Sequence, residues 1–322
     1  MLSVLSEDIV LLIRLREPAL ELCRLSDIGP NAKLETVCIL ALPEMTTSAS
    51  LRWATCFGEH PGHALFSKGR HPPEYAPGEY ASTPMQQPRE GKGARRNLQS
   101  VPADGIISVV MHVHGLSGYF RTIDLSVRCR ALLGFTDPNS PTWATAWAAQ
   151  AVRKPVEGER EREWPRTLPG VVTRPGEEDS LLIVPWEEWG PANTRILEHD
   201  SLTWGSLVGE RRATVGQVRP TVITMRDYNP FRVRRALART GGGAGAEVKL
   251  ECGSVIKVVD NTSVYRGGEW FYDDIESSLP YVETVTPYPG CEGIFMDEDN
   301  LMAEVRTEVS SHKTIVFLLF CD

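Results

Sequence analysis

The amino-acid sequence predicts an all-β fold of antiparallel hairpins and meanders with a few short helices. The most regular segments alternate apolar and polar residues with a period of two, as strands with one buried face do. These segments follow one another across short turns, without long helices between them, which favours a meander, sandwich or propeller over an α/β fold. The chain also has 27 glycines and 23 prolines in 322 residues, which suits many turns.

The N-terminal segment contains three predicted strands, at residues 9–15, 19–25 and 37–42. The apolar start of the chain carries Glu7 and Asp8 and has no basic segment ahead of its apolar run. It therefore reads as a strand rather than as a signal peptide.

Residues 107–113 and 121–129 form the next predicted hairpin. The apolar face of the first strand consists of Ile107, Val109, Met111 and Val113. The apolar face of the second consists of Ile123, Leu125, Val127 and Cys129, with Thr122, Asp124, Ser126 and Arg128 opposite. We expect the apolar faces to be buried and the opposite face to meet solvent.

Near the C-terminus, residues 293–296 and 301–306 flank a predicted turn at 297–300. Residues 304–309 alternate charged and uncharged side chains, which predicts a half-buried strand. Residues 315–320 are apolar on both faces and predict an interior strand.

Three segments interrupt this pattern. Residues 67–102 are rich in proline, glycine and charge, and predict a mobile loop. Residues 137–179 form an insertion, and residues 158–165 within it, after its first part, predict a charged linker. Residues 239–246 predict a glycine-rich hinge.

One helix is predicted inside the insertion, at residues 141–153. Ser140 is its expected N-cap and Pro141 occupies the first turn. Trp143, Trp147 and Ala151 then share one stripe of the helix.

The bulk composition excludes some classes of function. A formal net charge of −8 argues against nonspecific binding to nucleic acid, which needs a basic surface. The seven cysteines show no CxxC spacing, which predicts reduced, mostly buried thiols. No apolar run approaches the roughly 20 residues of a membrane helix, so we expect a cytoplasmic or nuclear protein without a membrane partner.

Two tryptophans three residues apart, Trp186 and Trp189, precede the pair Gly190-Pro191. The pair predicts a turn, and the two rings are expected to close over the end of a sheet. Arg195 is expected to pair with Glu187 or Glu188. An aromatic platform for a ligand is the alternative interpretation of these rings, and we prefer the structural one.

Residues 226–237 predict a strand, a turn and a short helix. Asn229 is the expected cap, Pro230 starts the helix, and Val233 contacts Leu237. The helix is strongly basic through Arg232, Arg234, Arg235 and Arg239. A solvated face with nearby acidic partners is the preferred interpretation. A basic patch for an acidic partner or for RNA is the alternative, and Arg232, Arg234 and Arg235 are candidate contacts to an acidic protein partner.

No motif predicts a catalytic residue, a cofactor or a metal ion. His112 and His114 lie on one face of a strand, but a third ligand is missing, so we interpret them as solvent-facing residues near a hairpin tip. The glycines at 240–245 lack the Lys-Ser/Thr of a phosphate loop, and 297–300 lack the spacing of a calcium loop. A Gly-x-Ser-x-Gly motif is also missing.

Four motifs occur in a fixed order, namely PWEEWGPANTR at 185–195, MRDYNPFRVRRAL at 225–237, LPYVE at 279–283 and GIFMDED at 293–299. This ordered set resembles the C-terminal region of a large family of basidiomycete (mushroom-type) F-box proteins. In that family a short F-box precedes a long β-rich region of propeller-like character. The resemblance implies that residues 1–322 form a single β-propeller-like domain, complete or incomplete.

The motif residues are expected to have structural roles. They are Trp186, Trp189, Gly190, Pro191, Arg195, Arg226, Asp227, Asn229, Pro230, Pro280, Tyr281, Met296 and Asp297.

F-box proteins are substrate receptors of cullin-based ubiquitin ligases, in which the F-box holds an adaptor and the C-terminal domain captures a target. No F-box is visible in this sequence, so the resemblance implies target capture without adaptor binding. We therefore expect a non-enzymatic protein-interaction module with an unknown protein target. A hydrolase or lyase on a propeller scaffold and a truncated or nonfunctional paralogue are the alternatives.

Overall fold

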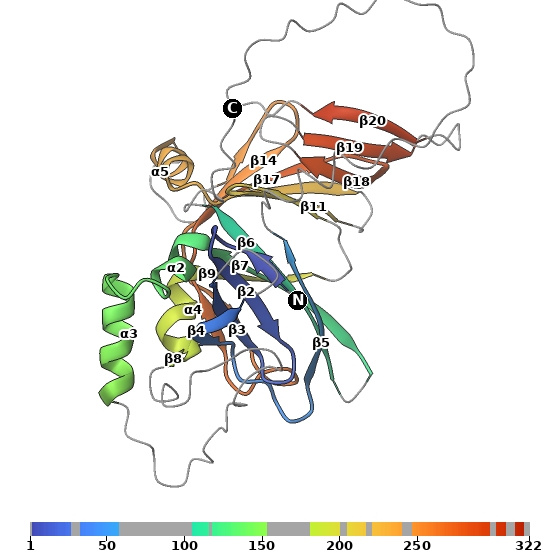
Figure 1. Cartoon of the computed structure of the whole chain (residues 1–322). Helices are drawn as coiled ribbons and strands as arrows, with labels where there is room; N and C mark the ends of the chain where they lie inside the picture. Colours follow the sequence, from blue (N-terminus) through green and yellow to red (C-terminus); the bar gives the residue numbers. More distant parts are fainter. Residues whose placement is uncertain are drawn as a thin grey trace, which may run out of the picture.

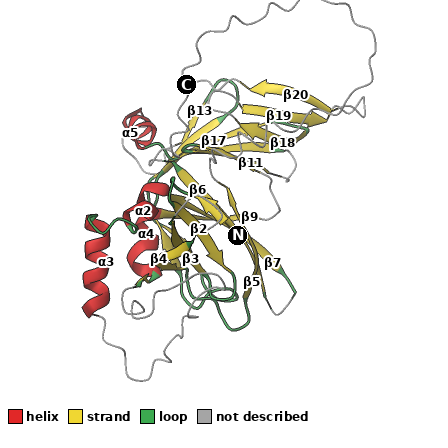
Figure 2. Ribbon diagram, viewed as in Figure 1, coloured by secondary structure: helices red, strands yellow, loops and turns green. Residues whose placement is uncertain are grey.

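The computed structural model describes residues 2–26, 33–57, 105–115, 118–152, 181–199, 205–216, 221–239, 247–296, 301–306 and 313–318. Most of these residues lie in strands, arranged in several sheets that are antiparallel except at one strand pair. The helices in this part of the chain are short, the longest having 12 residues. The prediction of a mostly β, antiparallel fold with a few short helices is therefore confirmed (Figure 2).

The first sheet has the strand order β1-β2-β3-β4-β8. Its strands are β1 (Leu2–Val4), β2 (Ile9–Arg14), β3 (Ala19–Leu25), β4 (Leu34–Ala41) and β8 (Leu182–Val184). The predicted N-terminal hairpins are present as β2–β3 and β3–β4. The short strand β8 lies parallel to β4 and adds to the edge of the sheet.

The second sheet has the strand order β5-β6-β7-β9. Its strands are β5 (Ser50–Phe57), β6 (Ile106–His114), β7 (Phe120–Arg128) and β9 (Thr194–His199). The apolar faces predicted for β6 and β7 are buried and pack against apolar side chains of the first sheet. The two sheets thus form one structure, called here the N-terminal sandwich, in the lower part of Figure 1.

Three helices lie beside the N-terminal sandwich, namely α2 (Cys129–Gly134), α3 (Pro141–Val152) and α4 (Trp186–Asn193). In α3 the predicted cap is present, because the backbone N–H of Thr142 donates to Ser140 Oγ at 3.1 Å. The rings of Trp143 and Trp147 stack with their centroids 5.9 Å apart, so the two residues lie on one stripe of the helix, as predicted. No helix in the described ranges is long and apolar enough to cross a membrane.

The remaining strands, apart from one hairpin, form the C-terminal sheets, seen in the upper part of Figure 1. One sheet has the order β10-β11-β12-β17-β14-β13, and a smaller one the order β18-β19-β20. The strands of the larger sheet are β10 (Gly205–Val208), β11 (Arg211–Gly216), β12 (Val222–Asp227), β13 (Glu247–Lys249), β14 (Val255–Val259) and β17 (Tyr281–Pro287). Those of the smaller sheet are β18 (Cys291–Met296), β19 (Leu301–Arg306) and β20 (Lys313–Leu318). Apolar side chains of β11 and β12 pack against those of β18 and β19 to form a second core.

One hairpin of the C-terminal half returns to the N-terminal sandwich. It consists of β15 (Ser263–Tyr265) and β16 (Ile275–Ser277). Trp270, Phe271 and Ile275 belong to the core of the sandwich, and Phe271 forms an isolated bridge with Met45. The two halves are therefore connected by packing as well as by the chain.

The interior strand predicted at residues 315–320 is described only as far as Leu318, within β20. β20 pairs with β19 and lies at the end of the order β18-β19-β20 in the part of the chain that the structure describes. Apolar residues on both faces indicate that both faces of a strand are covered. They do not indicate whether both of its hydrogen-bonding edges are paired.

Several predictions concern residues outside the described ranges. They are the mobile loop at 67–102, the charged linker at 158–165, the hinge glycines at 240–245 and the turn at 297–300.

The polar face of β7 is buried, which corrects the expectation that it meets solvent. Thr122, Asp124 and Ser126 have exposed fractions of 4%, 0% and 0%. The C-terminal sheets cover this face, because Arg212 of β11 pairs with Asp124 and the Tyr228 hydroxyl donates to Ser126 Oγ at 3.0 Å. Alternation alone predicts a polar face but does not distinguish solvent from a polar interface.

Candidate partner-binding surface

The two tryptophans of the first motif are buried in the N-terminal sandwich. Trp189 is 0% exposed, and its indole Nε1 donates to the carbonyl oxygen of Ala41 at the end of β4 at 2.8 Å. Trp186 is 5% exposed and meets Trp189 edge-on, with ring centroids 5.2 Å apart. Burial of both rings supports a structural role and leaves neither ring exposed as a ligand platform.

The predicted turn at Gly190-Pro191 is wrong, because both residues lie inside α4. Gly190 is required there by its neighbour, since a Cβ at this position would lie 2.4 Å from the Trp186 ring. The Pro191 carbonyl oxygen binds the second half of the chain. It accepts hydrogen bonds from the backbone N–H of Ser278 at 2.8 Å and from the Ser278 hydroxyl at 2.9 Å. A glycine-proline pair can therefore serve close packing as well as chain reversal.

The expected pairing of Arg195 with Glu187 or Glu188 is also wrong. Arg195 is 0% exposed, and it donates to the carbonyl oxygens of Leu279 at 2.9 Å and Asn261 at 3.0 Å and to Ser263 Oγ. β9 points its side chain at residues 261–279, while Glu187 and Glu188 belong to the preceding helix. Burial lowers the pKa of Arg195. Tyr281 and Tyr228, which lie nearby, offset part of this effect by raising the pKa.

The second and third motifs meet in the C-terminal sheets. Arg226 of β12 donates to Glu283 of β17 at 2.9 Å, and its guanidinium lies 5.9 Å from the Tyr281 ring. Tyr228 and Tyr281 have ring centroids 5.4 Å apart. Residues more than fifty positions apart in sequence thus meet in one largely buried region, which supports structural roles for Arg226 and Tyr281.

Three further motif residues have separate positions. Pro280 is partly buried just before β17, and Met296 is 9% exposed in the core between the two C-terminal sheets. Asp297 lies outside the described residues.

The basic segment forms helix α5 (Pro230–Arg239), as predicted. Asn229 caps it, because its Oδ1 accepts from the backbone N–H groups of Phe231 at 2.9 Å and Arg232 at 3.2 Å. Val233 is 4% exposed and fixes one side of the helix to the sheet. In Figure 1, α5 projects from the sheets near the junction of the two halves.

Asp227 anchors the start of α5. Its Oδ1 accepts from the backbone N–H of Asn229 at 2.9 Å, and its Oδ2 lies 3.3 Å from Nε of Arg232 and 3.4 Å from Nε of Arg211. Burial raises the pKa of Asp227, while the Asn229 N–H and the two arginines lower it in part. The predicted pairing of helix arginines with acidic neighbours is thus confirmed for Arg232.

The outer face of α5 combines an exposed aromatic ring with unshielded cations. Phe231 is 72% exposed, and the guanidinium of Arg234 lies 4.7 Å from its ring centroid. Arg235 and Arg239 are exposed beside them. We name Phe231, Arg234, Arg235 and Arg239 the α5 surface.

Sequence reasoning named the arginines but missed Phe231. The signal was present in the spacing, because Phe231 falls off the stripe formed by Val233 and Leu237. A large apolar residue on the polar face of a basic helix is a candidate binding residue.

The histidine pair is only partly as expected. His112 is 6% exposed and does not face solvent, because the Trp53 ring covers it, with the two ring centroids 4.4 Å apart. Burial lowers the pKa of His112, and His114 lowers it further. The rings of His114 and Phe120 stack, with their centroids 5.9 Å apart. Across the described residues, His, Cys, Asp and Glu side chains form no group of three that could hold a metal ion.

Comparisons with known proteins give no neighbour for this chain, since no family model, curated protein or solved structure matches it.

Proposed function

We propose that this chain is a non-enzymatic protein-interaction module that uses the α5 surface to bind an acidic segment of a partner protein. The observation that carries the proposal is the exposed Phe231 ring with the Arg234 guanidinium over it. Aromatic residues and arginine are enriched where partners contribute most binding energy. The capped, anchored helix holds these side chains on a rigid element.

Charge supports an acidic partner. The whole chain has a formal net charge of −8, while α5 contains four arginines and no acidic residue. This local reversal of sign favours encounter with an acidic segment and disfavours basic ones. Only Arg232 of the four is held in an ion pair with a carboxylate within the described part of the chain.

The finer architecture and the cellular role are part of the same proposal. Serial antiparallel hairpins support a β-propeller-like arrangement, and the four ordered motifs support kinship with the target-capturing domain of F-box receptors. The six cysteines within the described ranges are free thiols, which supports a reducing compartment such as the cytoplasm or nucleus.

The enzyme alternative has weaker support. Burial raises the carboxyl pKa of Glu17, beside β2, and of Asp227, on β12. These two groups belong to different halves of the molecule and do not form a paired acid and base.

The test uses a fluorescent decapeptide of alternating glutamate and leucine. We expect saturable binding that weakens with salt, and a loss of at least about tenfold in affinity in Arg234→Glu/Arg235→Glu. Phe231→Ala should weaken binding by about tenfold, as loss of an aromatic anchor does.

The matched control is Arg130→Glu/Arg266→Glu, which makes the same charge change at two exposed arginines outside α5, one in α2 and one just after β15. Equal weakening in the control and in the α5 variant would refute the α5 surface as the binding site. Tighter binding of a single-stranded RNA decamer than of the peptide would reassign the surface to nucleic acid.

A further inference from the structure

The hairpin of β15 and β16 presents an acidic surface on the N-terminal sandwich. Val264 and Glu276 lie opposite each other in its register, and both side chains are exposed. Tyr272 and Asp273 are exposed in the loop that joins the two strands. We name Val264, Tyr272, Asp273 and Glu276 the hairpin surface.

The hairpin surface is complementary in charge to the α5 surface. Residues 263–276 contain four acidic residues and one arginine, whereas α5 contains four arginines and no acidic residue. Opposite potentials attract two surfaces during encounter and select the orientation in which they meet. The hairpin therefore carries the charge that the α5 surface requires of a partner.

Both surfaces also present large apolar side chains. Phe231 is 72% exposed on α5, while Val264 and Tyr272 are 53% and 52% exposed on the hairpin. Exposed ion pairs alone contribute little binding energy, because water and salt screen them. An aromatic contact surrounded by charged side chains combines affinity at the centre with orientation at the rim.

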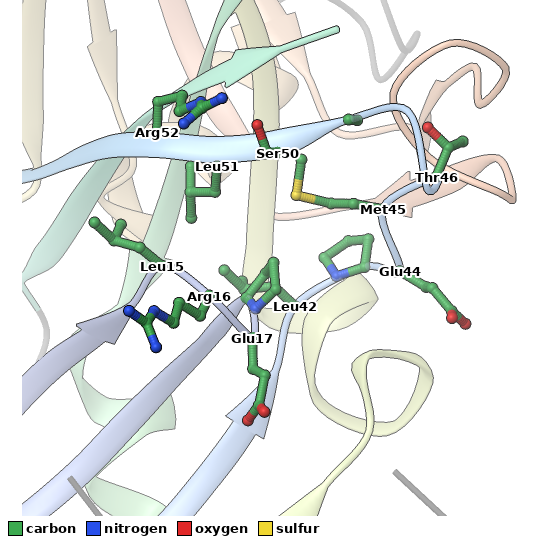
Figure 3. Close-up of a pocket in the computed structure, with 13 residues that line it drawn as sticks. Leu15, Arg16, Glu17, Leu42, Glu44, Met45, Thr46, Ser50, Leu51 and Arg52 are labelled. Carbon is green, nitrogen blue, oxygen red and sulfur yellow. The ribbon is translucent and has the colours of Figure 1, made fainter. Parts of the chain in front are cut away.

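The segment that follows β4 holds the hairpin loop in place. The backbone N–H of Thr46 donates to the carbonyl oxygen of Trp270 at 3.1 Å, and the backbone N–H of Tyr272 donates to the carbonyl oxygen of Glu44 at 3.1 Å. Figure 3 shows Glu44 and Thr46 on this segment, beside the faint ribbon of the hairpin. A loop fixed in this way loses little conformational entropy when it binds a partner.

The two surfaces do not meet within one molecule. α5 packs against β14 and β17, whereas the hairpin packs against α4 and β9. In Figure 1, α5 lies with the C-terminal sheets, while the buried residues of the hairpin belong to the core of the N-terminal sandwich below. Because the helix and the hairpin are each anchored to their own half, the complementary surfaces can meet only between molecules.

We propose that the acidic partner of the α5 surface is a second copy of this chain, which binds through its hairpin surface. This inference rests on the proposed function, because it names the partner of the same surface. The carboxylates of one copy lie near the arginines of the other, and Tyr272 packs against Phe231. The contact joins two different patches, so every copy carries both halves of it.

Sedimentation velocity of the full chain over a range of concentrations measures this self-association. We expect association that weakens as the salt concentration rises. The α5 variant Arg234→Glu/Arg235→Glu and the hairpin variant Asp273→Lys/Glu276→Lys should each weaken it by at least about tenfold. Association that neither variant weakens would overturn the proposal.

The matched control is Glu7→Lys/Glu35→Lys, which makes the same charge change at two exposed glutamates, one before β2 and one in β4. Asp274 is retained in every variant, because its Oδ1 accepts from the backbone N–H of Gly267 at 2.8 Å within the hairpin loop. Equal weakening in the control and in the hairpin variant would contradict a specific contact.

A mixture of the two variants gives the most direct test. The α5 variant supplies an intact hairpin surface, and the hairpin variant supplies an intact α5 surface. We therefore expect the equimolar mixture to form a complex at concentrations at which neither variant associates alone. Combining the four substitutions in one chain should restore self-association with the charges exchanged. No complex in the mixture, with both variants folded by thermal melting, would refute the contact.

The decapeptide of alternating glutamate and leucine separates failure of this inference from failure of the proposed function. The peptide should dissociate the self-associated protein, since both bind the α5 surface. A chain that stays monomeric up to about 1 mM and still binds the peptide would overturn this inference and leave the proposed function intact. Self-association that persists at saturating peptide would also overturn this inference.

Discussion

Asp124 of β7 and Arg212 of β11 form a buried ion pair that joins the two halves of the molecule. Their side chains are 0% and 4% exposed. The Asp124 carboxylate also accepts from Ser108 Oγ of the adjacent strand at 2.5 Å. A buried carboxylate is thus satisfied from both sides of the junction, which specifies how the halves meet.

Asp124→Asn should lower the free energy of unfolding by about 3–5 kcal/mol, because it leaves the buried Arg212 guanidinium without a counter-charge. Urea unfolding followed by tryptophan fluorescence measures this loss. The double variant Asp124→Leu/Arg212→Met should be less destabilised than Asp124→Asn, since it removes both charges. A loss below about 1 kcal/mol in Asp124→Asn would show that the pair does not hold the junction.

The junction marks the limit of what the sequence predicts. The period-two pattern of β7 correctly separates Ile123 and Leu125 from Asp124 and Ser126. It does not predict that a distant strand supplies Arg212 to bury the polar face, because that contact spans 88 residues. Alternation encodes the two faces of a strand, whereas tertiary packing decides which face meets solvent.

Trp189→Ala should destabilise the protein by about 3–5 kcal/mol, because it empties a fully buried site in the larger core. The indole is 0% exposed and donates a hydrogen bond to the Ala41 carbonyl. Trp189→Phe retains much of the apolar volume and should cost less. Equilibrium denaturation of both variants checks the order, and a loss under about 1 kcal/mol in Trp189→Ala would assign the ring a surface role.

Gly190→Ala should destabilise α4 by about 1–3 kcal/mol through overpacking. The added Cβ would lie 2.4 Å from the Trp186 ring, which cannot move freely because it is 5% exposed. Combining the change with Trp186→Leu should recover part of the loss, since the smaller side chain removes the clash. Thermal melting of the two single variants and the double variant gives the coupling, and strictly additive losses would refute the clash.

Local signals were easier to interpret than these long-range contacts. The Asn229 cap and Pro230 start of α5 follow from chemistry within one helical turn, and the structure confirms both. The Gly190-Pro191 pair misled because the same residues suit a turn or a close helix contact. The ring that decides between them, Trp186, is four residues away and needs a helix to reach Gly190.

Ionisation of the buried Tyr228 hydroxyl should make the protein less stable at high pH. Burial raises the pKa of this hydroxyl to about 12, from an ordinary value near 10. Between these values the unfolded chain releases the proton while the folded protein retains it, so deprotonation favours the unfolded state. The stability contributed by the protonated hydroxyl is complete below about pH 10 and is lost as the pH rises through about 12, a change of about 2–3 kcal/mol.

Urea unfolding from about pH 9 to about pH 12 tests this dependence. Tyr228→Phe should cost about 1 kcal/mol at neutral pH, because the hydrogen bond to Ser126 is lost, and should reduce the decline at high pH. Tyr272→Phe is the matched control, since Tyr272 is 52% exposed and should leave the decline unchanged. An identical decline in Tyr228→Phe and the unmodified protein would show that another group controls alkaline stability.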